Sequence, residues 1–151
     1  MTAAIALGSN LGDRASYLDA ALRAMGSLPH TALLAASEFL ETEPVGDPDQ
    51  GPYLNAAALL RTELAPHGLL AALQSIERAH GRDRARERRW GPRTLDLDLL
   101  VYADLVLDEP GLTIPHPRMH ERAFVLRPLV LIAPELVVPG RGPVADLLAG
   151  L

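Results

Sequence analysis

The order of its apolar segments is what most constrains the fold of this chain. The spacing of apolar residues predicts helices at residues 14–26 and 66–81. It predicts strands at residues 2–8, 31–42, 53–61 and 94–102. The resulting order, strand, helix, strand, strand, helix, strand, is the split βαβ arrangement of ferredoxin-like folds. We therefore predict an α+β sandwich with a mainly antiparallel sheet.

Capping residues mark the ends of both predicted helices. Asp13 can cap the first helix and Gly26 ends it. Pro66 opens the second helix at a first helical position, and Gly81 follows its last turn. After the sixth element come a turn-rich stretch, an apolar helix around residues 122–132 and a Gly/Pro-rich tail. These last segments predict a C-terminal helical extension.

Composition limits the domain count and the classes of function. A chain of 151 residues, 48% of them apolar, is long enough for one hydrophobic core, so we expect a single domain over residues 1–151. It contains no cysteine, no secretory leader is evident, and no apolar run approaches the roughly 20 residues of a membrane helix. We expect a cytoplasmic protein. All 14 basic residues are arginine, which excludes the lysine-dependent phosphate loop and protein-kinase motifs.

Residues 82–93 form an arginine-rich stretch on an acidic chain. They contain six arginines against Asp83 and Glu87, although the net charge of the whole chain is −5. One basic loop on an acidic body favours a small polyanion as ligand over a nucleic acid, which usually meets basic charge spread across a face. The alternative at this point is a solvated run of charge.

The segment 94–102 alternates as a strand and carries two carboxylates. We expect its residues to divide between two faces, Leu97, Leu99 and Val101 on one and Asp96, Asp98, Leu100 and Tyr102 on the other. Asp96 and Asp98 would then point the same way beside the basic loop. Hard oxygen ligands of this kind suit magnesium, which binds through one or two carboxylates together with substrate phosphates. The alternative is a polar edge strand that faces solvent.

A few further side chains are candidates for a site. His116 lies between Pro115 and Pro117, which fix the backbone, and we expect its ring to donate a hydrogen bond to phosphate. A zinc site of His116 with His120 is the weaker alternative. Core packing is the competing interpretation for the aromatic residues Tyr53 and Phe124.

Four ordered groups of residues carry a resemblance to a known family. They are residues 5–12 (IALGSNLG), residues 53–57 (YLNAA), residues 89–98 (RWGPRTLDLD), and residues 114–117 (IPHP) with residues 122–124 (RAF). The chain resembles the 6-hydroxymethyl-7,8-dihydropterin pyrophosphokinase family of folate biosynthesis over nearly its whole length. The resemblance implies transfer of the terminal diphosphate of ATP to the hydroxymethyl group of the dihydropterin, with release of AMP and use of two magnesium ions.

The resemblance also implies a role for individual residues. The catalytic residues would be Arg82, Arg93, Asp96 and Asp98, of which Asp96 and Asp98 would hold the metal ions. The ATP-binding residues would be Gln74, Glu77, Arg84, Trp90, Leu99, Thr113, His116 and Arg122. The pterin-binding residues would be Gly8, Thr42, Val45, Tyr53, Asn55 and Phe124, with the pterin stacked between Tyr53 and Phe124. Within the basic loop, Arg88 or Arg89 could take the part given to Arg82 or Arg84.

A non-catalytic nucleotide-binding or RNA-binding module is the alternative from another class, because ferredoxin-like sheets bind RNA through aromatic residues on the sheet face. Aromatic residues are only 4% of this chain, its net charge is negative, and it lacks the aromatic RNA-binding motif of such sheets. The resemblance implies ATP and the dihydropterin as small-molecule partners, and we expect no nucleic acid, no membrane and no evident obligate protein partner.

Overall fold

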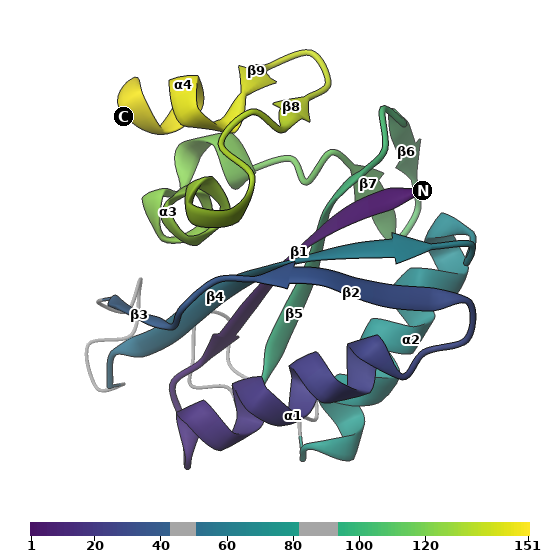
Figure 1. Ribbon diagram of the computed structural model, residues 1–151, viewed down its shortest axis with the longest axis vertical. Coiled ribbons are helices and arrows are strands. Elements are labelled where there is room, and N and C mark those ends of the chain that lie inside the picture. Colours follow the sequence, from purple (N-terminus) through teal and green to yellow (C-terminus); the bar gives the residue numbers. More distant parts are fainter. Residues whose placement is uncertain (43–50, 82–93) are drawn as a thin grey trace.

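The computed structural model describes residues 1–42, 51–81 and 94–151 (Figure 1). Its strands are β1 (Thr2–Ser9), β2 (Thr31–Ala36), β3 (Leu40–Thr42), β4 (Tyr53–Thr62), β5 (Asp96–Tyr102), β6 (Leu107–Glu109), β7 (Leu112–Ile114), β8 (Val137–Val138) and β9 (Gly142–Pro143). Its helices are α1 (Arg14–Gly26), α2 (Pro66–Ala79), a 3-10 turn (Met119–Glu121), α3 (Ala123–Ile132) and α4 (Val144–Ala149).

The main sheet has the strand order β2-β4-β1-β5, and β3 pairs with β4 beyond the end of β2. All of these pairs are antiparallel. α1 connects β1 to β2 and α2 connects β4 to β5, so each helix crosses over a strand that lies between the two it joins. This confirms the split βαβ arrangement and the antiparallel α+β class. Figure 1 shows α1 and α2 on one side of the sheet, with α3, α4 and the β8–β9 hairpin on the other.

Each face of the sheet has its own buried core. Under α1 and α2, large side chains such as Ile5, Leu7 and Leu97 pack with the apolar faces of the two helices. On the opposite face the strands contribute small residues, among them Ala6 and Ala57, against the aliphatic side chains of α3. Small residues on the strands let α3 approach the sheet closely, because side-chain size sets the spacing between packed layers. The C-terminal extension therefore covers the second face.

The predicted starts of both helices are confirmed, whereas α2 ends at Ala79, before the predicted residue 81. Asp13 precedes α1, and its carboxylate accepts a hydrogen bond from the Ser16 backbone N–H at 3.2 Å. That bond satisfies one of the backbone donors that a helix leaves without a partner at its first turn. Pro66 is at the start of α2, where a missing N–H costs nothing.

The strand predicted over residues 31–42 is in fact divided into β2 and β3. Ser37 causes the division, because its Oγ accepts a hydrogen bond from the Ala57 N–H at 2.9 Å while its own N–H donates to the Ala57 carbonyl at 2.9 Å. A side-chain oxygen thus takes the place of a backbone partner at this point. The chain can then shift before β3 pairs with the beginning of β4.

The predicted faces of β5 are correct up to Leu100 and wrong beyond it. The register passes from Ile5 opposite Leu99 to Ala4 opposite Val101, which leaves Leu100 as the extra residue of a β-bulge. Leu100 and Val101 consequently both pack in the α3 core, whereas the Tyr102 ring packs on the α1/α2 side. Period-two alternation holds only while each residue has one partner, so the bulge exchanges the faces of Val101 and Tyr102.

Two short hairpins and one helix appear where only turns and a tail were predicted. β6 pairs with β7 over three residues in each strand, and β8 pairs with β9 over two. Such segments are too short to show a sequence period. The β6–β7 hairpin leads directly into the segment Ile114-Pro115-His116, in which the Ile114–Pro115 peptide bond is cis.

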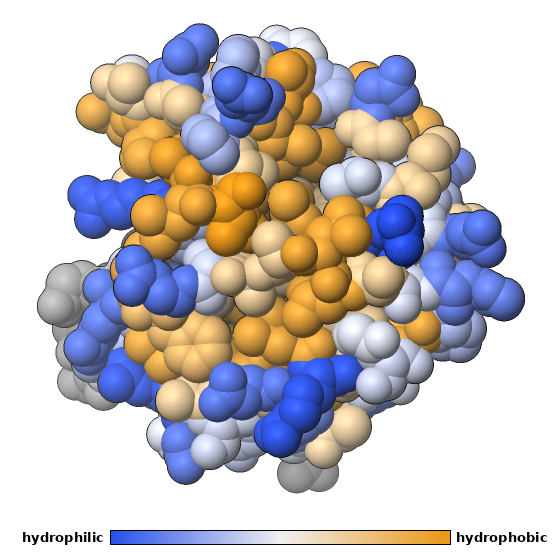
Figure 2. All heavy atoms as spheres, viewed as in Figure 1, coloured by the Kyte–Doolittle hydropathy of each residue, from blue (hydrophilic) through white to orange (hydrophobic). Residues whose placement is uncertain are grey.

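Apolar residues gather across the middle of the surface in Figure 2, the region that β2 occupies in Figure 1. Leu34 of this edge strand is 49% exposed and Leu33 is 37% exposed. In the part of the chain that the structure describes, no helix combines the length and the apolar character needed to cross a membrane.

Candidate functional site

One row of paired residues brings predicted site residues from three strands together. Gly8 of β1 lies opposite Asn55 of β4 on one side and opposite Asp96 of β5 on the other. In the same way, Ala6 lies between Ala57 and Asp98. Directly paired residues share a sheet face, and Ala6 and Ala57 belong to the core beneath α3. Asp96 and Asp98 therefore both face the α3 side, which confirms the prediction that they share one face.

The end of β3 adds Thr42 to this face, and the start of β4 adds Tyr53. Thr42 is paired with Tyr53, and its hydroxyl oxygen accepts a hydrogen bond from the Asn55 amide nitrogen. A methyl group in place of the Gly8 hydrogen would stand 3.1 Å from the Asn55 Oδ1 and 3.4 Å from a Tyr53 ring carbon. Glycine at this position lets the amide and the ring lie close against β1. Gly8, Thr42, Tyr53 and Asn55, which the sequence predicted as one group, are neighbours in the structure.

Asp96 and Asp98 are both partly buried, while Leu97 between them is 2% exposed in the opposite core. Among the described residues, no group of three or more His, Cys, Asp or Glu side chains is arranged to hold a metal ion. Two carboxylates on one face nevertheless fit a magnesium site that substrate phosphates complete, because this ion commonly takes one or two protein carboxylates. The residues present thus suit a divalent cation bound together with a phosphate ligand.

His116 lies beside this pair and is held in a neutral form. Its backbone N–H donates to the Leu100 carbonyl at 2.8 Å, which anchors the segment to β5. Burial lowers the pKa of the His116 ring from 6.5 to about 4, the Arg122 guanidinium adds to the shift, and Asp96 opposes it. The Arg118 backbone N–H donates to His116 Nδ1 at 3.2 Å. The remaining ring proton is then on Nε2, so the ring can donate one hydrogen bond from that atom.

Arg122 and Phe124 enter the site at the beginning of α3. The Arg122 guanidinium carbon lies 5.7 Å from the centre of the Phe124 ring, within the range of a cation–π contact. Burial lowers the pKa of Arg122 from its ordinary value, while the carboxylate of Asp98 acts most strongly in the opposite direction, followed by that of Asp96. A guanidinium stays charged at neutral pH under such a shift. The site therefore pairs a positive group with the two carboxylates across the sheet face.

Four residues predicted on the nucleotide side do not join this cluster. Leu99 is 4% exposed in the core of α1 and α2, on the face opposite Asp98. Glu77 of α2 is 1% exposed, and its Oε2 accepts a hydrogen bond from the Leu97 backbone N–H at 2.8 Å. Gln74 also belongs to α2. Thr113 lies in β7, and its hydroxyl donates a hydrogen bond to the Asp108 carboxylate at 3.3 Å. Their proposed contacts with a nucleotide stay predictions.

Five of the predicted site residues lie outside the described ranges: Val45, Arg82, Arg84, Trp90 and Arg93. The stretch between Gly81 and Thr94, which includes the alternatives Arg88 and Arg89, is among them. Two described residues have a part in the site that the sequence prediction did not assign. The Arg118 backbone fixes the His116 ring, and the buried Asn10 side chain donates to the Gly51 carbonyl at 3.3 Å. Asn10 lay within the motif of residues 5–12, which was a signal available in the sequence.

Some known proteins are similar to this chain in sequence, and some solved structures are similar to it in fold. The family model described as 7,8-dihydro-6-hydroxymethylpterin-pyrophosphokinase (HPPK) matches residues 4–134. A 2-amino-4-hydroxy-6-hydroxymethyldihydropteridine pyrophosphokinase from Haemophilus influenzae is 48% identical over 147 residues, covering 97% of this chain and 91% of that protein. The protein of the same name from Pseudomonas aeruginosa is 48% identical over 145 residues, covering 96% of this chain and 88% of that protein.

A crystal structure of the Plasmodium falciparum HPPK-DHPS protein with pteroate is similar to this fold with a TM-score of 0.74. The similarity covers 99% of this chain but 42% of the solved chain, at 13% sequence identity. At that identity the comparison bears on the fold alone. It agrees with the antiparallel α+β arrangement described above.

Proposed function

The chain belongs to the 7,8-dihydro-6-hydroxymethylpterin-pyrophosphokinase family, and from that premise we propose that it transfers the terminal diphosphate of ATP to the hydroxymethyl group of 6-hydroxymethyl-7,8-dihydropterin, releasing AMP. It is accordingly an ATP-dependent pyrophosphokinase, a transferase of folate biosynthesis. The observation that carries the proposal is the placement of Asp96 and Asp98 on the sheet face that also carries Asn55, beside Arg122 and His116. We expect the protein in the cytoplasm, with ATP and the dihydropterin as its substrates.

The two carboxylates account for the phosphate end of the site. Asp96 and Asp98 would hold two magnesium ions together with the phosphates of ATP. Magnesium held there would offset the negative charge of the phosphates during transfer. The chain then orients the donor with its own groups: Arg122 provides a fixed positive charge, and His116 Nε2 donates a hydrogen bond without carrying a charge at neutral pH.

The group Gly8, Thr42, Tyr53 and Asn55 accounts for the acceptor end. A pterin ring has a flat apolar face and an edge of amide-like donors and acceptors, which suits an aromatic side chain beside an asparagine amide. Tyr53 and Phe124 would stack on the ring, and Asn55 would hydrogen-bond its edge. Val45 and the backbone of Gly8 and Thr42 would complete the contacts.

The remaining predicted residues act on the nucleotide. Arg82, Arg84 and Arg93 would clamp the phosphates with Trp90, because the arginine fork donates two parallel hydrogen bonds to phosphate oxygens. Gln74, Glu77, Leu99 and Thr113 would border the nucleotide. Glu77 would in addition fix the backbone of β5, because its buried carboxylate accepts the Leu97 N–H. No protein nucleophile is needed, because the chemistry depends on proximity and on charge stabilisation.

The test is to incubate the full chain with ATP, magnesium and 6-hydroxymethyl-7,8-dihydropterin and to measure AMP and the pterin diphosphate. Absence of both products above a no-enzyme control would overturn the proposal. Asp96→Asn and Asp98→Asn should each abolish turnover with an unchanged circular dichroism spectrum. Asp104→Asn, at an exposed aspartate just beyond β5, is the matched control and should keep turnover close to that of the wild type.

A direct metal titration separates the carboxylate assignment from the overall activity. In the presence of a non-hydrolysable ATP analogue, the wild-type protein should bind Mn²⁺ as a magnesium substitute more tightly than either aspartate variant. Equal Mn²⁺ affinity in the wild type and both variants would refute the metal role of the pair, even if turnover were lost.

A further inference from the structure

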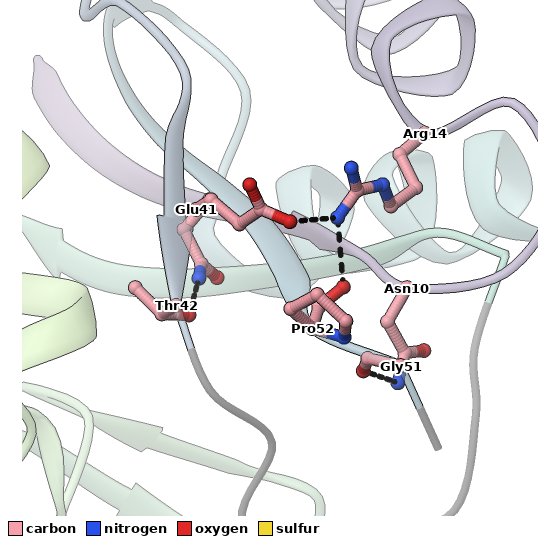
Figure 3. Close-up of polar contacts among 7 residues, drawn as sticks. Asn10, Arg14, Glu41, Thr42, Gly51 and Pro52 are labelled. Atoms are coloured by element: carbon pink, nitrogen blue, oxygen red, sulfur yellow. Dashed lines mark hydrogen bonds and ion pairs between the residues drawn. The ribbon is translucent and has the colours of Figure 1, made fainter.

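We propose that Arg14 is a positioning residue for the pterin-binding end of the site. The proposal rests on the proposed function and adds a residue that lies on the opposite sheet face from the substrate. Figure 3 shows Arg14 reaching from the start of α1 toward Glu41 of β3 and toward the backbone just before β4. The same guanidinium nitrogen, Nη1, lies 2.9 Å from the Pro52 carbonyl oxygen and 3.3 Å from Glu41 Oε1.

Both partners of Arg14 are direct neighbours of residues proposed to contact the pterin. Glu41 precedes Thr42 in β3, and Pro52 precedes Tyr53 at the start of β4. Thr42 and Tyr53 are themselves paired across the two strands. One guanidinium group therefore joins the end of β3 to the start of β4 within one residue of each of these side chains.

The contact is made from behind the site because successive side chains of a strand point to opposite faces. Glu41 is paired with Leu54, which packs against the core of α1 and α2. Thr42, one residue later, points to the α3 side and accepts the hydrogen bond from Asn55. β3 is thus held by Arg14 on one face and by Asn55 on the other.

β3 depends on such contacts because it is short and pairs with β4 alone among the described strands. It has three residues. Asn10 adds a second bond of the same kind, from its Nδ2 to the Gly51 carbonyl at 3.3 Å (Figure 3). The start of α1 and the loop before it therefore fix the position at which β4 begins, and with it the Tyr53 ring.

The ion pair alone would contribute little, because the Glu41 side chain is 58% exposed and exposed ion pairs have small net effects. The bond from Arg14 to the Pro52 carbonyl matters more, since the Arg14 side chain is 31% exposed and the bond is partly buried. Its expected effect is on the geometry of the pterin contacts, where small displacements are costly, and much less on the free energy of unfolding.

The experiment measures two affinities in the full chain. Arg14→Ala should raise the Kd for 6-hydroxymethyl-7,8-dihydropterin, measured with a non-hydrolysable ATP analogue present, by about fivefold or more. The Kd for the ATP analogue itself should change by less than about twofold. Glu41→Gln, which keeps the bond to Pro52, should have a smaller effect on the pterin Kd. Arg23→Ala is the matched control, because Arg23 is an exposed arginine of the same helix.

The outcomes separate this inference from the proposed function. A pterin Kd that Arg14→Ala raises no more than Arg23→Ala does would overturn the positioning role and leave the proposed function standing. Equal losses of pterin and ATP-analogue affinity, with a lowered melting temperature, would show a general structural role and also overturn it. Failure of the wild-type chain to bind the pterin would overturn the proposed function and this inference together.

Discussion

Substitutions at Glu77 test how a buried side chain of α2 stabilises β5, the strand that carries Asp96 and Asp98. Its carboxylate is buried at 1% exposure and accepts the Leu97 backbone N–H at 2.8 Å, between the two residues Asp96 and Asp98 that face the opposite side. β5 is an edge strand that pairs with β1 alone in the described sheet. A side chain from α2 thus satisfies a backbone donor that the edge of the sheet leaves without a strand partner.

Three substitutions at Glu77 separate the hydrogen bond from the charge and from packing. Glu77→Ala leaves the Leu97 N–H buried without this acceptor, which costs about 1–3 kcal/mol, and loses buried methylene packing worth roughly 1 kcal/mol. We expect a total loss of about 2–4 kcal/mol in the free energy of unfolding. Glu77→Leu restores the packing but not the bond, so about 1–3 kcal/mol should be lost. Glu77→Gln keeps an acceptor oxygen at the same place and should change stability by less than about 1 kcal/mol, because the bond from the Leu97 N–H is retained.

Urea unfolding followed by circular dichroism measures these differences, and thermal unfolding should show about 2–4 °C for each kcal/mol in a chain of this length. Arg78→Ala, at the exposed neighbour on the same helix, is the control and should stay within about 0.5 kcal/mol of the wild type. If Glu77→Gln destabilises the fold as much as Glu77→Ala does, the hydrogen bond to Leu97 is not what Glu77 contributes. The reasoning would also fail if all three substitutions were neutral.

Four further outcomes follow from individual residues. Gly8→Ala should abolish pterin binding in calorimetric titrations while leaving ATP-analogue binding in place, because the added methyl group would press on Asn55 Oδ1 and fill the space beside the Tyr53 ring. Since the pKa of His116 is lowered to about 4, the unfolded chain binds a proton at this residue between pH 6.5 and 4 and the folded chain does not. Its contribution to stability should therefore fall as the pH falls through that window, and His116→Asn should remove this part of the slope in urea unfolding at several pH values. Leu129→Ala, at a fully buried position of α3, should cost about 2–5 kcal/mol in urea unfolding. Leu34→Lys on the exposed edge of β2 should leave stability within about 0.5 kcal/mol and reduce light scattering by concentrated protein.

Each of these outcomes has a result that would contradict it. Unchanged pterin affinity in Gly8→Ala would mean that the ligand does not use the space beside Asn55. If the pH dependence of unfolding stability were the same in the wild type and in His116→Asn, the neutral, partly buried His116 ring would be refuted. A loss below about 1 kcal/mol in Leu129→Ala would show that α3 packs loosely on the sheet. Increased light scattering by Leu34→Lys would contradict the argument from the exposed edge.

The sequence by itself determined the order of the elements, the ends of the first two helices and the shared face of Asp96 and Asp98. These features depend on local rules: the periods of helix and strand, the capping carboxylate of Asp13 and the first-turn proline Pro66. The motif residues that carry the family resemblance were likewise available from the sequence alone. Gly8, Tyr53 and Asn55 are among these motif residues, and the pairing of β1, β3 and β4 places them together.

The tertiary structure alone decided the features that depend on partners distant in the chain. Ser37 divides a strand because Ala57 lies opposite it, and the bulge at Leu100 exchanges the faces of the residues after it because of its register with β1. The neutral form of His116 comes from burial and from the nearby charge of Arg122, neither of which a local pattern contains. The contacts of Arg14 with the end of β3 and the start of β4 are likewise long-range, because Glu41 and Pro52 are 27 and 38 positions away in the chain.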